Sequence, residues 1–304
     1  MKVFVDGSAG TTGLEIVKRL SERRDLTLVM LSESERKDAA ARKAALLSAD
    51  LAILCLPDEA AVEAVSFAEG SEVKIIDAST AHRVSPAFTY GFPELAGQRD
   101  RIKAAKYVAN PGCHASGFIA LVQPLVKAGV LRKDAPLTCF SLTGYTGGGK
   151  KMIADYEGEG GSLLVAPRQY ATGQSHKHLP EMQAVSGIDR APIFLPVVAA
   201  FPRGMQVSVP LPTDYLTVGA SEVREVYRER YHGGGVVRFE EDYAASMPAD
   251  ALAGKDSMAI SVIGNEERIV AVATFDNLGK GASGAAIQNM NLMLGAEETL
   301  GLNV

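Results

Sequence analysis

The sequence predicts an α/β protein in which a doubly wound, Rossmann-like domain is joined to an α+β domain with a mixed sheet. Short apolar segments alternate with helical patterns over about the first 80 residues, which is typical of a parallel sheet wound with helices. Beyond residue 110 the apolar segments are separated by long polar or glycine-rich stretches, which favour an antiparallel or mixed sheet. We therefore expect one domain over 1–112 and 281–304, and a second over 113–280.

The elements of the first domain follow from this alternation. Leu14, Val17 and Leu20 have helical spacing, and the third apolar run stops at Pro57. We expect strands at 2–6, 26–31, 50–56 and 73–77, and helices at 14–20, 39–48 and 60–68.

The second domain begins after a strong turn, Asn110-Pro111-Gly112. A helix is expected at 113–127, kinked at Pro124. Glycine runs at 147–149 and 233–235 indicate loops. A final small-residue helix, about 282–300, is expected to return and cover the first domain. Strands are expected at 137–142, 193–200, 205–209 and 269–274.

Composition limits the function classes. The 304 residues carry 31 Lys and Arg against 36 Asp and Glu, a net charge of −5, which argues against a nucleic-acid binder. An apolar run of about 18 residues, as a membrane span requires, is absent from the sequence. Three cysteines, an odd and sparse number, suit a reducing compartment, and we expect a cytoplasmic protein.

A glycine loop lies between the first strand and the first helix. Gly7, Gly10 and Gly13 allow a tight turn and close approach of a pyrophosphate, and the helix start supplies free N–H groups. This position favours a dinucleotide site over a plain glycine-rich turn. The residues expected to bind the cofactor here are Gly7, Ser8, Gly10, Thr11, Thr12 and Gly13.

The end of the second strand bears on the choice between NAD and NADP. Enzymes that use NAD usually place an acid there for the ribose 2′-hydroxyl. Here Ser32, Ser34, Arg36 and Lys37 suit a 2′-phosphate, although two glutamates lie among them. We therefore expect NADP, provided that these glutamates point into solvent.

Cys113 follows the Asn-Pro-Gly turn and opens an apolar helix. A helix N-terminus stabilises a thiolate, so the position is expected to depress the pKa of Cys113 and make it a nucleophile. The alternative, a buried inert thiol, fits Cys55 and Cys139, which lie inside apolar strands.

A segment rich in histidine spans residues 174–181. His176 and His178 are candidates for moving a proton, and His176 is slightly favoured because Pro180 follows close to His178. The alternatives are a polar surface turn or half of a metal site. A metal is not expected, because no cysteine or acid stands at ligand spacing.

Several cations stand in polar or glycine-rich stretches. Arg83, Lys150 and Arg203 are candidates for binding the anionic groups of a substrate, although each alone is typical of a solvated surface charge.

Taken together, these segments resemble the N-acetyl-gamma-glutamyl-phosphate reductase family, in its shorter form. The resemblance extends over essentially the whole chain, in order. The matching segments are 7–13, 77–83, 110–113, 144–150, 176–181 and 276–284.

The resemblance implies an NADPH-dependent reduction of N-acetyl-L-glutamyl 5-phosphate to the 5-semialdehyde, with release of phosphate, through a thioester on Cys113. It implies a dinucleotide-binding domain over 1–112 and 281–304, and a catalytic and oligomerisation domain over 113–280. It adds Asn277 as a cofactor-binding residue and implies a homodimer or homotetramer. The alternatives are an aspartate-semialdehyde dehydrogenase-like reductase and a non-catalytic NADP-sensing protein of the same fold.

Overall fold

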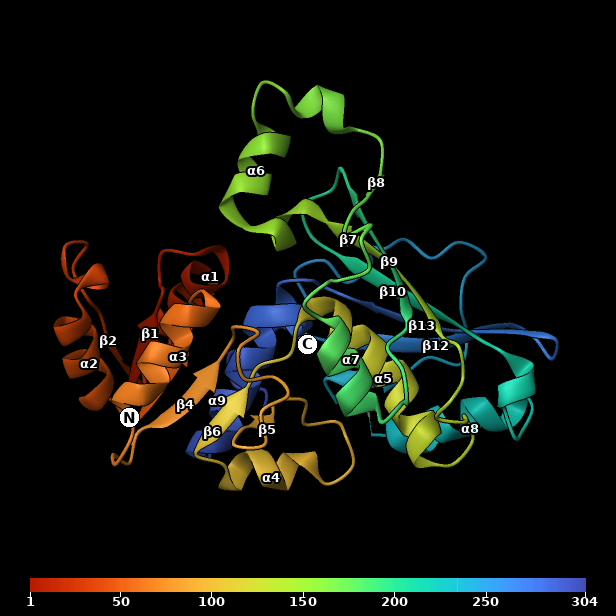
Figure 1. Cartoon of the computed structure of the whole chain (residues 1–304), viewed down its shortest axis with the longest axis horizontal. Helices are drawn as coiled ribbons and strands as arrows, with labels where there is room; N and C mark the ends of the chain where they lie inside the picture. The colour runs from red at the N-terminus through yellow and green to blue at the C-terminus, as the bar shows by residue number, and fades with distance from the viewer. Residues whose placement is uncertain (234) are drawn as a thin grey trace. The chain divides into compact units, whose positions relative to one another are not determined.

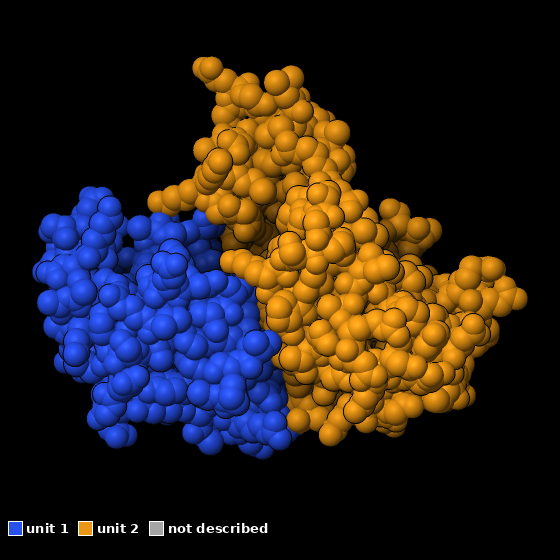
Figure 2. Space-filling view, in the orientation of Figure 1, with its two compact units in different colours: residues 1–93, 97–111, 282–302 blue, residues 94–96, 112–281, 303–304 orange. Residues whose placement is uncertain are grey.

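The computed structural model describes residues 1–233 and 235–304, and the chain divides into two compact units (Figure 2). Unit 1 comprises Met1–Pro93, Gly97–Pro111 and Ala282–Leu302. Unit 2 comprises Glu94–Ala96, Gly112–Gly281 and Asn303–Val304. Each unit is built on its own sheet.

Unit 1 contains a six-stranded sheet in the order β2-β1-β3-β4-β6-β5, and every neighbouring pair is parallel (Figure 1). This confirms the doubly wound, Rossmann-like domain. Its elements are β1 (Lys2–Asp6), α1 (Thr11–Ser21), β2 (Thr27–Val29), η1 (Glu35–Lys37), α2 (Ala39–Leu47), β3 (Leu51–Leu54), α3 (Asp58–Phe67), β4 (Lys74–Asp77), β5 (Thr89–Tyr90), α4 (Gln98–Ala104), β6 (Tyr107–Ala109) and α9 (Gly284–Leu294).

The two faces of this sheet bury different side chains. Alternation along β1 sends Val3 and Val5 into one cluster and Phe4 into the other. The Val3 cluster includes Ile16 of α1, and the Phe4 cluster includes Leu46 of α2. Helices therefore cover both faces, as a parallel sheet of apolar strands requires.

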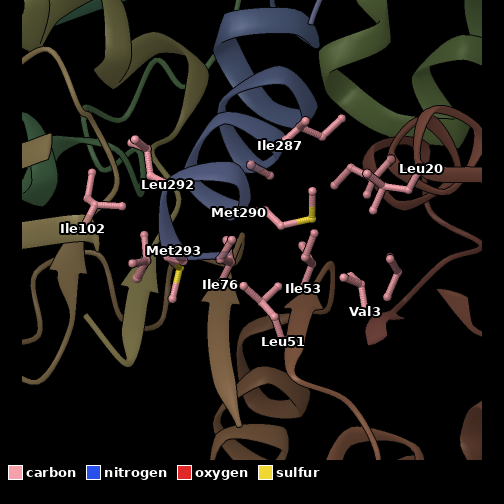
Figure 3. Packing of buried hydrophobic residues seen from close by; sticks show 14 residues of the cluster. Val3, Leu20, Leu51, Ile53, Ile76, Ile102, Ile287, Met290, Leu292 and Met293 are labelled. Atoms are coloured by element: carbon pink, nitrogen blue, oxygen red, sulfur yellow. The ribbon is translucent and has the colours of Figure 1, made fainter. Parts of the chain in front are cut away.

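The C-terminal helix α9 completes the core of unit 1. Ile287 and Met290 lie in the same cluster as Ile53 of β3 and Ile76 of β4 (Figure 3). The prediction that the tail returns to cover the first domain is confirmed.

Unit 2 contains a seven-stranded sheet in the order β11-β12-β13-β10-β7-β9-β8. The pairs β7–β9 and β11–β12 are parallel and the others antiparallel, so the sheet is mixed, as expected. Its elements are α5 (Cys113–Lys127), β7 (Thr138–Gly144), η2 (Tyr145–Gly148), α6 (Gly149–Glu157), η3 (Gly161–Leu164), β8 (Arg168–Gln169), α7 (Leu179–Ser186), β9 (Ile193–Ala199), β10 (Met205–Leu211), η4 (Thr213–Tyr215), α8 (Ala220–Arg230), β11 (Val237–Phe239), β12 (Met258–Asn265), β13 (Arg268–Phe275) and η5, a π-helical turn (Gly279–Ser283).

Helix α5 continues through Pro124 to Lys127. Proline lacks the N–H that would bond the carbonyl four residues earlier, at Ala120. The Tyr231 hydroxyl donates to that carbonyl at 2.6 Å, and the Tyr227 hydroxyl donates to the next one, at Leu121. Two buried tyrosines, Tyr227 of α8 and Tyr231 at its C-cap, thus support the helix where proline weakens it.

Several expectations about local structure were wrong. The glycines at 147–149 lie in η2 and the start of α6 rather than in a loop. The last helix ends at Leu294, because Gly295 takes the left-handed conformation, and does not reach residue 300. Gly233 lies in a turn, whereas Gly234 lies outside the described residues.

A helix needs about 20 apolar residues to cross a bilayer. The helix α5 has 15 residues, and among residues 1–233 and 235–304 no helix is long and apolar enough to span a membrane.

Candidate active site

Cys113 is the first residue of α5, and Gly112, in an extended conformation, is the N-cap. The first N–H groups of a helix have no partner within it and face outward from its end. Ser116 closes the first turn, because its backbone N–H and its hydroxyl both donate to the Gly112 carbonyl, at 2.8 and 3.0 Å. The backbone of Gly281 lies against this end: a Cβ placed on it would be 3.0 Å from the Cβ of Cys113.

Three histidines from two separate parts of unit 2, α5 and the 174–181 segment, meet near this end of α5. The ring of His114 lies 5.7 Å from that of His176 and 5.6 Å from that of His178, centroid to centroid. His176 and His178 are themselves 4.6 Å apart and perpendicular, and Phe194 packs against His114 and His176. The structure therefore brings the two predicted histidines together with a third.

The two histidines of the 174–181 segment differ in their surroundings. Nδ1 of His176 accepts the backbone N–H of His178 at 3.1 Å, so a neutral His176 ring carries its proton on Nε2. His178 is buried, and its Nε2 lies 4.0 Å from the carboxylate of Glu181, one turn along α7. Glu181 is also buried, and its other oxygen accepts the Gly112 N–H at 3.2 Å.

His114 is held at both ring nitrogens. Nδ1 is 2.7 Å from the Ser141 hydroxyl on β7, and Nε2 is 2.6 Å from the Tyr170 hydroxyl. Burial, together with the neighbouring His176, lowers the pKa of His114 to about 3, so the ring is neutral at physiological pH. Burial also raises the pKa of the Tyr170 hydroxyl, and the nearby Cys113 raises it further, so the phenol stays protonated.

The glycine loop in unit 1 has the geometry of a dinucleotide cradle. Gly7 has φ +83°, and a Cβ there would lie 2.2 Å from the Cys55 carbonyl oxygen. A Cβ on Gly13 would lie 2.4 Å from the Gly7 carbonyl oxygen. Only glycine fits at these two positions, so the backbone turns tightly into the N-terminus of α1, as a pyrophosphate site requires.

Other residues of the loop are consistent with such a site. Gly10 is the N-cap of α1, and Thr11 and Thr12 form its first turn. The hydroxyl oxygen of Thr11 is buried and makes no hydrogen bond to any described residue. A buried hydroxyl without a protein partner is what a phosphate-binding loop would offer to an absent ligand.

The segment after β2 places Ser32, Ser34, Arg36 and Lys37 together, the last two within η1. The Glu35 carboxylate turns back toward them: it accepts the Ser32 backbone N–H at 2.9 Å and also the Ser32 hydroxyl. These hydrogen bonds lower the pKa of Glu35. Here a carboxylate occupies the Ser32 donors that were predicted to bind a 2′-phosphate.

Comparison with known proteins places the chain in a family. The model described as the NAD binding domain of semialdehyde dehydrogenase matches residues 2–105, and the one described as its dimerisation domain matches residues 113–277. Curated N-acetyl-gamma-glutamyl-phosphate reductases from Brucella ovis and Brucella anthropi are each 49% identical to it over 97% of this chain, and over 99% and 98% of their own lengths. The chain belongs to the N-acetyl-gamma-glutamyl-phosphate reductase family.

Solved structures support the fold of this reductase family member. Aspartate semialdehyde dehydrogenase II from Vibrio cholerae has a TM-score of 0.75 at 18% identity, covering 96% of this chain and 98% of that one. An aspartate semialdehyde dehydrogenase with NADP from Candida albicans has a TM-score of 0.72 at 14% identity, covering 97% and 98%. At such identities the likeness concerns the fold alone, and it confirms the predicted combination of domains.

Three of the remaining predicted residues have side chains engaged within their own unit. Arg83 donates to the backbone carbonyls of Asn110 and Ala78, at 3.1 and 3.2 Å. Arg203 forms a two-point ion pair with the buried Asp276, at 2.8 and 3.2 Å. Asn277 is buried; its amide oxygen accepts the Gly204 N–H, and its amide nitrogen donates to the Thr146 hydroxyl.

Lys150, by contrast, is exposed at the start of α6. For this reductase family member, the roles of Arg83, Lys150 and Arg203 toward substrate, and of Asn277 toward cofactor, stay predictions. Arg83 and Arg203 show how a cation in a polar stretch can instead bind backbone carbonyls or a buried carboxylate.

Three side chains of the site were not among the expected functional candidates: His114, Ser141 and Tyr170. Glu181 belongs to the 174–181 segment singled out from the sequence; it stands three residues after His178, and such spacing shares a helix face. The contact of His114 with Ser141 and Tyr170 spans 27 and 56 residues, which no local pattern reveals.

The three histidines do not form a metal site. Within the described residues, no group of three or more His, Cys, Asp or Glu side chains has a geometry that could hold a metal ion.

Proposed function

We propose that the chain reduces N-acetyl-L-glutamyl 5-phosphate to N-acetyl-L-glutamate 5-semialdehyde with release of phosphate. The observation that carries this proposal is the position of Cys113, which opens α5 beside three histidines in a chain 49% identical to reductases named for this substrate. A nicotinamide dinucleotide held by the glycine loop supplies the hydride.

Cys113 acts as the nucleophile. Its sulfur, as thiolate, forms a bond to the acyl carbon, and the bond from that carbon to the phosphate oxygen breaks, which leaves a thioester and free phosphate. Addition of hydride to the thioester carbon and of a proton to its oxygen gives a thiohemiacetal. Loss of that hydroxyl proton and cleavage of the carbon–sulfur bond then release the aldehyde and return the thiolate. The outward N–H groups of the first turn of α5 stabilise the negative oxygen of the tetrahedral species.

We propose His178 as the group that receives the thiol proton. A neutral His176 carries its proton on Nε2, and its Nδ1 is engaged by the backbone N–H of His178, so in this geometry it is a donor. A proton gained by His178 gives an imidazolium 4.0 Å from the buried Glu181 carboxylate, which stabilises that charge. This assignment differs from the slight preference for His176 that the sequence suggested.

We propose NADP as the cofactor. Arg36 and Lys37 supply positive charge in η1, at the end of the strand where the 2′-position of the ribose is expected. Binding requires the Glu35 carboxylate to leave Ser32, and because Glu35 is exposed, it can turn into solvent. If it stayed, it would accept a ribose hydroxyl and favour NAD.

We propose that the chain forms a homodimer or homotetramer through the sheet of unit 2. The family model matching 113–277 is described as a dimerisation domain. On one face of this sheet Phe140 of β7 is paired in register with Leu195 of β9, and Phe140 and the nearby Ile193 are 40% and 60% exposed. A large apolar side chain exposed on a sheet face is typical of an interface.

That interface has a direct test. Phe140→Glu should shift the sedimentation coefficient toward that of a monomer, because it places a charge within the apolar face. Leu163→Glu is the matched control, because Leu163 is an 86% exposed residue of η3 outside the sheet; this variant should leave the sedimentation coefficient unchanged. An unchanged assembly in Phe140→Glu would reject this face.

The substrate is tested in the reverse direction. The protein is incubated with NADP, phosphate and either N-acetylglutamate semialdehyde or aspartate semialdehyde, and nicotinamide absorbance is followed. Phosphate-dependent turnover with the N-acetylated compound alone supports the proposal. A preference for aspartate semialdehyde favours an aspartate-semialdehyde dehydrogenase-like reductase, and cofactor binding without turnover of either compound favours a non-catalytic NADP-sensing protein.

We propose a cytoplasmic location, because a reaction that depends on a cysteine thiol suits a reducing compartment.

A further inference from the structure

We propose that His114 is a positioning residue that holds the Tyr170 hydroxyl as a hydrogen-bond donor to the Cys113 thiolate, with Ser141 fixing the tautomer of the imidazole. The inference rests on the proposed role of Cys113 as nucleophile. It concerns the residue next to the nucleophile in sequence, whose ring is buried within unit 2.

The first step is geometric. His114 is 3% exposed, and each ring nitrogen has a hydroxyl partner: Ser141 at 2.7 Å on Nδ1 and Tyr170 at 2.6 Å on Nε2. The ring is further surrounded by Phe194, His176 and His178 at centroid distances between 5.2 and 5.7 Å. These contacts fix the imidazole in position, so the Tyr170 oxygen is fixed as well.

The second step concerns protons. A neutral imidazole has one N–H and one acceptor nitrogen. The hydroxyl of Tyr170 bonds the ring of His114, the residue that follows Cys113 in the chain, and the phenol stays protonated because burial raises its pKa and Cys113 raises it further. Beside an anionic sulfur the phenol must present its hydrogen, so its oxygen accepts from Nε2–H of His114. Nδ1 is then the acceptor, and the Ser141 hydroxyl must donate to it.

The third step is the consequence for reactivity. The Ser141 hydroxyl thus donates to His114, and His114 donates to the Tyr170 oxygen. The Tyr170 O–H is then available to donate to the Cys113 thiolate. A hydrogen bond to a charged acceptor is stronger than one between neutral groups. Without His114, the Tyr170 hydroxyl is free to rotate, and its hydrogen is no longer directed at sulfur.

The experiment measures the thiol itself, with neither substrate nor cofactor present. Alkylation of Cys113 by iodoacetamide is followed against pH by peptide mass spectrometry. Cys55 and Cys139 do not interfere, because burial raises the pKa of both, that of Cys55 to about 12. Since no turnover is needed, a wrong substrate assignment leaves the result unaffected.

We expect His114→Phe and Tyr170→Phe each to raise the pH midpoint of alkylation by about one unit, which is about a tenfold slower reaction at a fixed pH below the midpoint. Because His114 acts through Tyr170, the double variant should match Tyr170→Phe alone. Tyr231→Phe removes another buried hydroxyl bonded to α5, at Ala120, and is the control that should leave the midpoint unchanged.

Two results would overturn the proposal: a wild-type midpoint in His114→Phe, or shifts that add in the double variant. If His114→Phe does not fold, Ser141→Ala carries the test, because it keeps the ring and removes only the hydroxyl that selects the tautomer. Its midpoint should rise, though by less, and a wild-type midpoint in Ser141→Ala would then reject the role of His114.

Discussion

The side-chain amide of Asn289, on the C-terminal helix α9, donates to the side-chain oxygen of Asn110 at 3.1 Å, three residues before Cys113. The same amide nitrogen donates to the Gly91 carbonyl at 2.9 Å. Asn110 in turn donates from its own amide to the Ala282 carbonyl, and from its backbone N–H to Asp77. The residue that leads into the Pro-Gly-Cys turn is thus held at its side chain and its backbone by unit 1.

This arrangement predicts that Asn289 matters for turnover. Asn289→Leu keeps the size of the side chain and removes both hydrogen bonds, so Asn110 loses one of its supports. We expect kcat to fall by about tenfold or more, because a small misplacement of a nucleophile is costly. Affinity for the dinucleotide, measured by fluorescence titration, should change little.

Asn291→Leu is the matched control for that variant. Asn291 is equally buried two residues further along α9, but its amide donates to the carbonyls of Glu298 and Leu300. Both variants should lose similar stability, whereas only Asn289→Leu should lose turnover. Equal turnover in the two proteins would show that the contact with Asn110 is structural alone.

Cys113→Ser should bind the dinucleotide with unchanged affinity and lose nearly all turnover. A neutral hydroxyl at the start of α5 lacks the nucleophilicity of a thiolate, and the glycine loop that holds the cofactor is untouched. Stopped-flow and steady-state absorbance measure the turnover, and titration of nicotinamide fluorescence measures binding. Near-normal activity in this variant would exclude the thioester mechanism.

The two histidines are separated by replacing each with asparagine. His178→Asn should lower kcat by about 10²–10⁴, the usual contribution of a general acid or base. His176→Asn should act mainly on KM, because His176 donates in the observed geometry and its Nδ1 is used by the backbone. A larger loss of kcat in His176→Asn would reverse the assignment, and small equal losses would reject both.

Replacing Arg36 and Lys37 together with alanine should weaken NADP binding and leave NAD binding nearly unchanged, because only NADP carries the 2′-phosphate that these cations would meet. Glu35→Gln should act in the opposite direction and tighten NADP binding, since it removes the carboxylate that engages Ser32. Dissociation constants for both cofactors decide the matter. Parallel losses for NAD and NADP would mean that η1 does not contact the 2′-phosphate.

The sequence predicts an element well where residues within or beside that element determine it, and less well where contacts with distant parts of the chain do. The boundaries of α5 were predicted to the residue, because Pro111 and Gly112 mark its start in the sequence. β2, expected at 26–31, is shorter, Thr27–Val29, because an edge strand pairs on one side only. α8 was missed because charged residues dominate it, although Ala220, Val223 and Tyr227 have helical spacing.

The same distinction applies to the candidate site: some of its residues follow from local patterns, and others depend on distant contacts. Cys113, His176 and His178 were predicted as candidates from turn and spacing patterns within a few residues of each. The role of His114 depends on Ser141 and Tyr170, which come from a strand and a loop far along the chain. Burial gives the same residue a pKa of about 3, and burial is a property of the folded unit rather than of the residues beside it.

Helix α5, which carries Cys113 at its start, has its weakest point near its other end. Pro124 removes the N–H that would bond the Ala120 carbonyl, and the Tyr231 hydroxyl replaces that donor at 2.6 Å. Tyr231→Phe therefore leaves a buried carbonyl without a donor and should lower the free energy of unfolding by about 1–3 kcal/mol.

Two further variants establish that proline is the reason. Adding Pro124→Ala to Tyr231→Phe restores an N–H for the Ala120 carbonyl and should recover most of the loss. Tyr227→Phe should cost less than Tyr231→Phe, because the Leu121 carbonyl that it bonds keeps the N–H of Leu125 as a helical partner. Chemical denaturation of the four proteins measures this, and a loss in the double variant as large as in Tyr231→Phe alone would mean that the hydroxyl stabilises α8 rather than the gap that Pro124 leaves in α5.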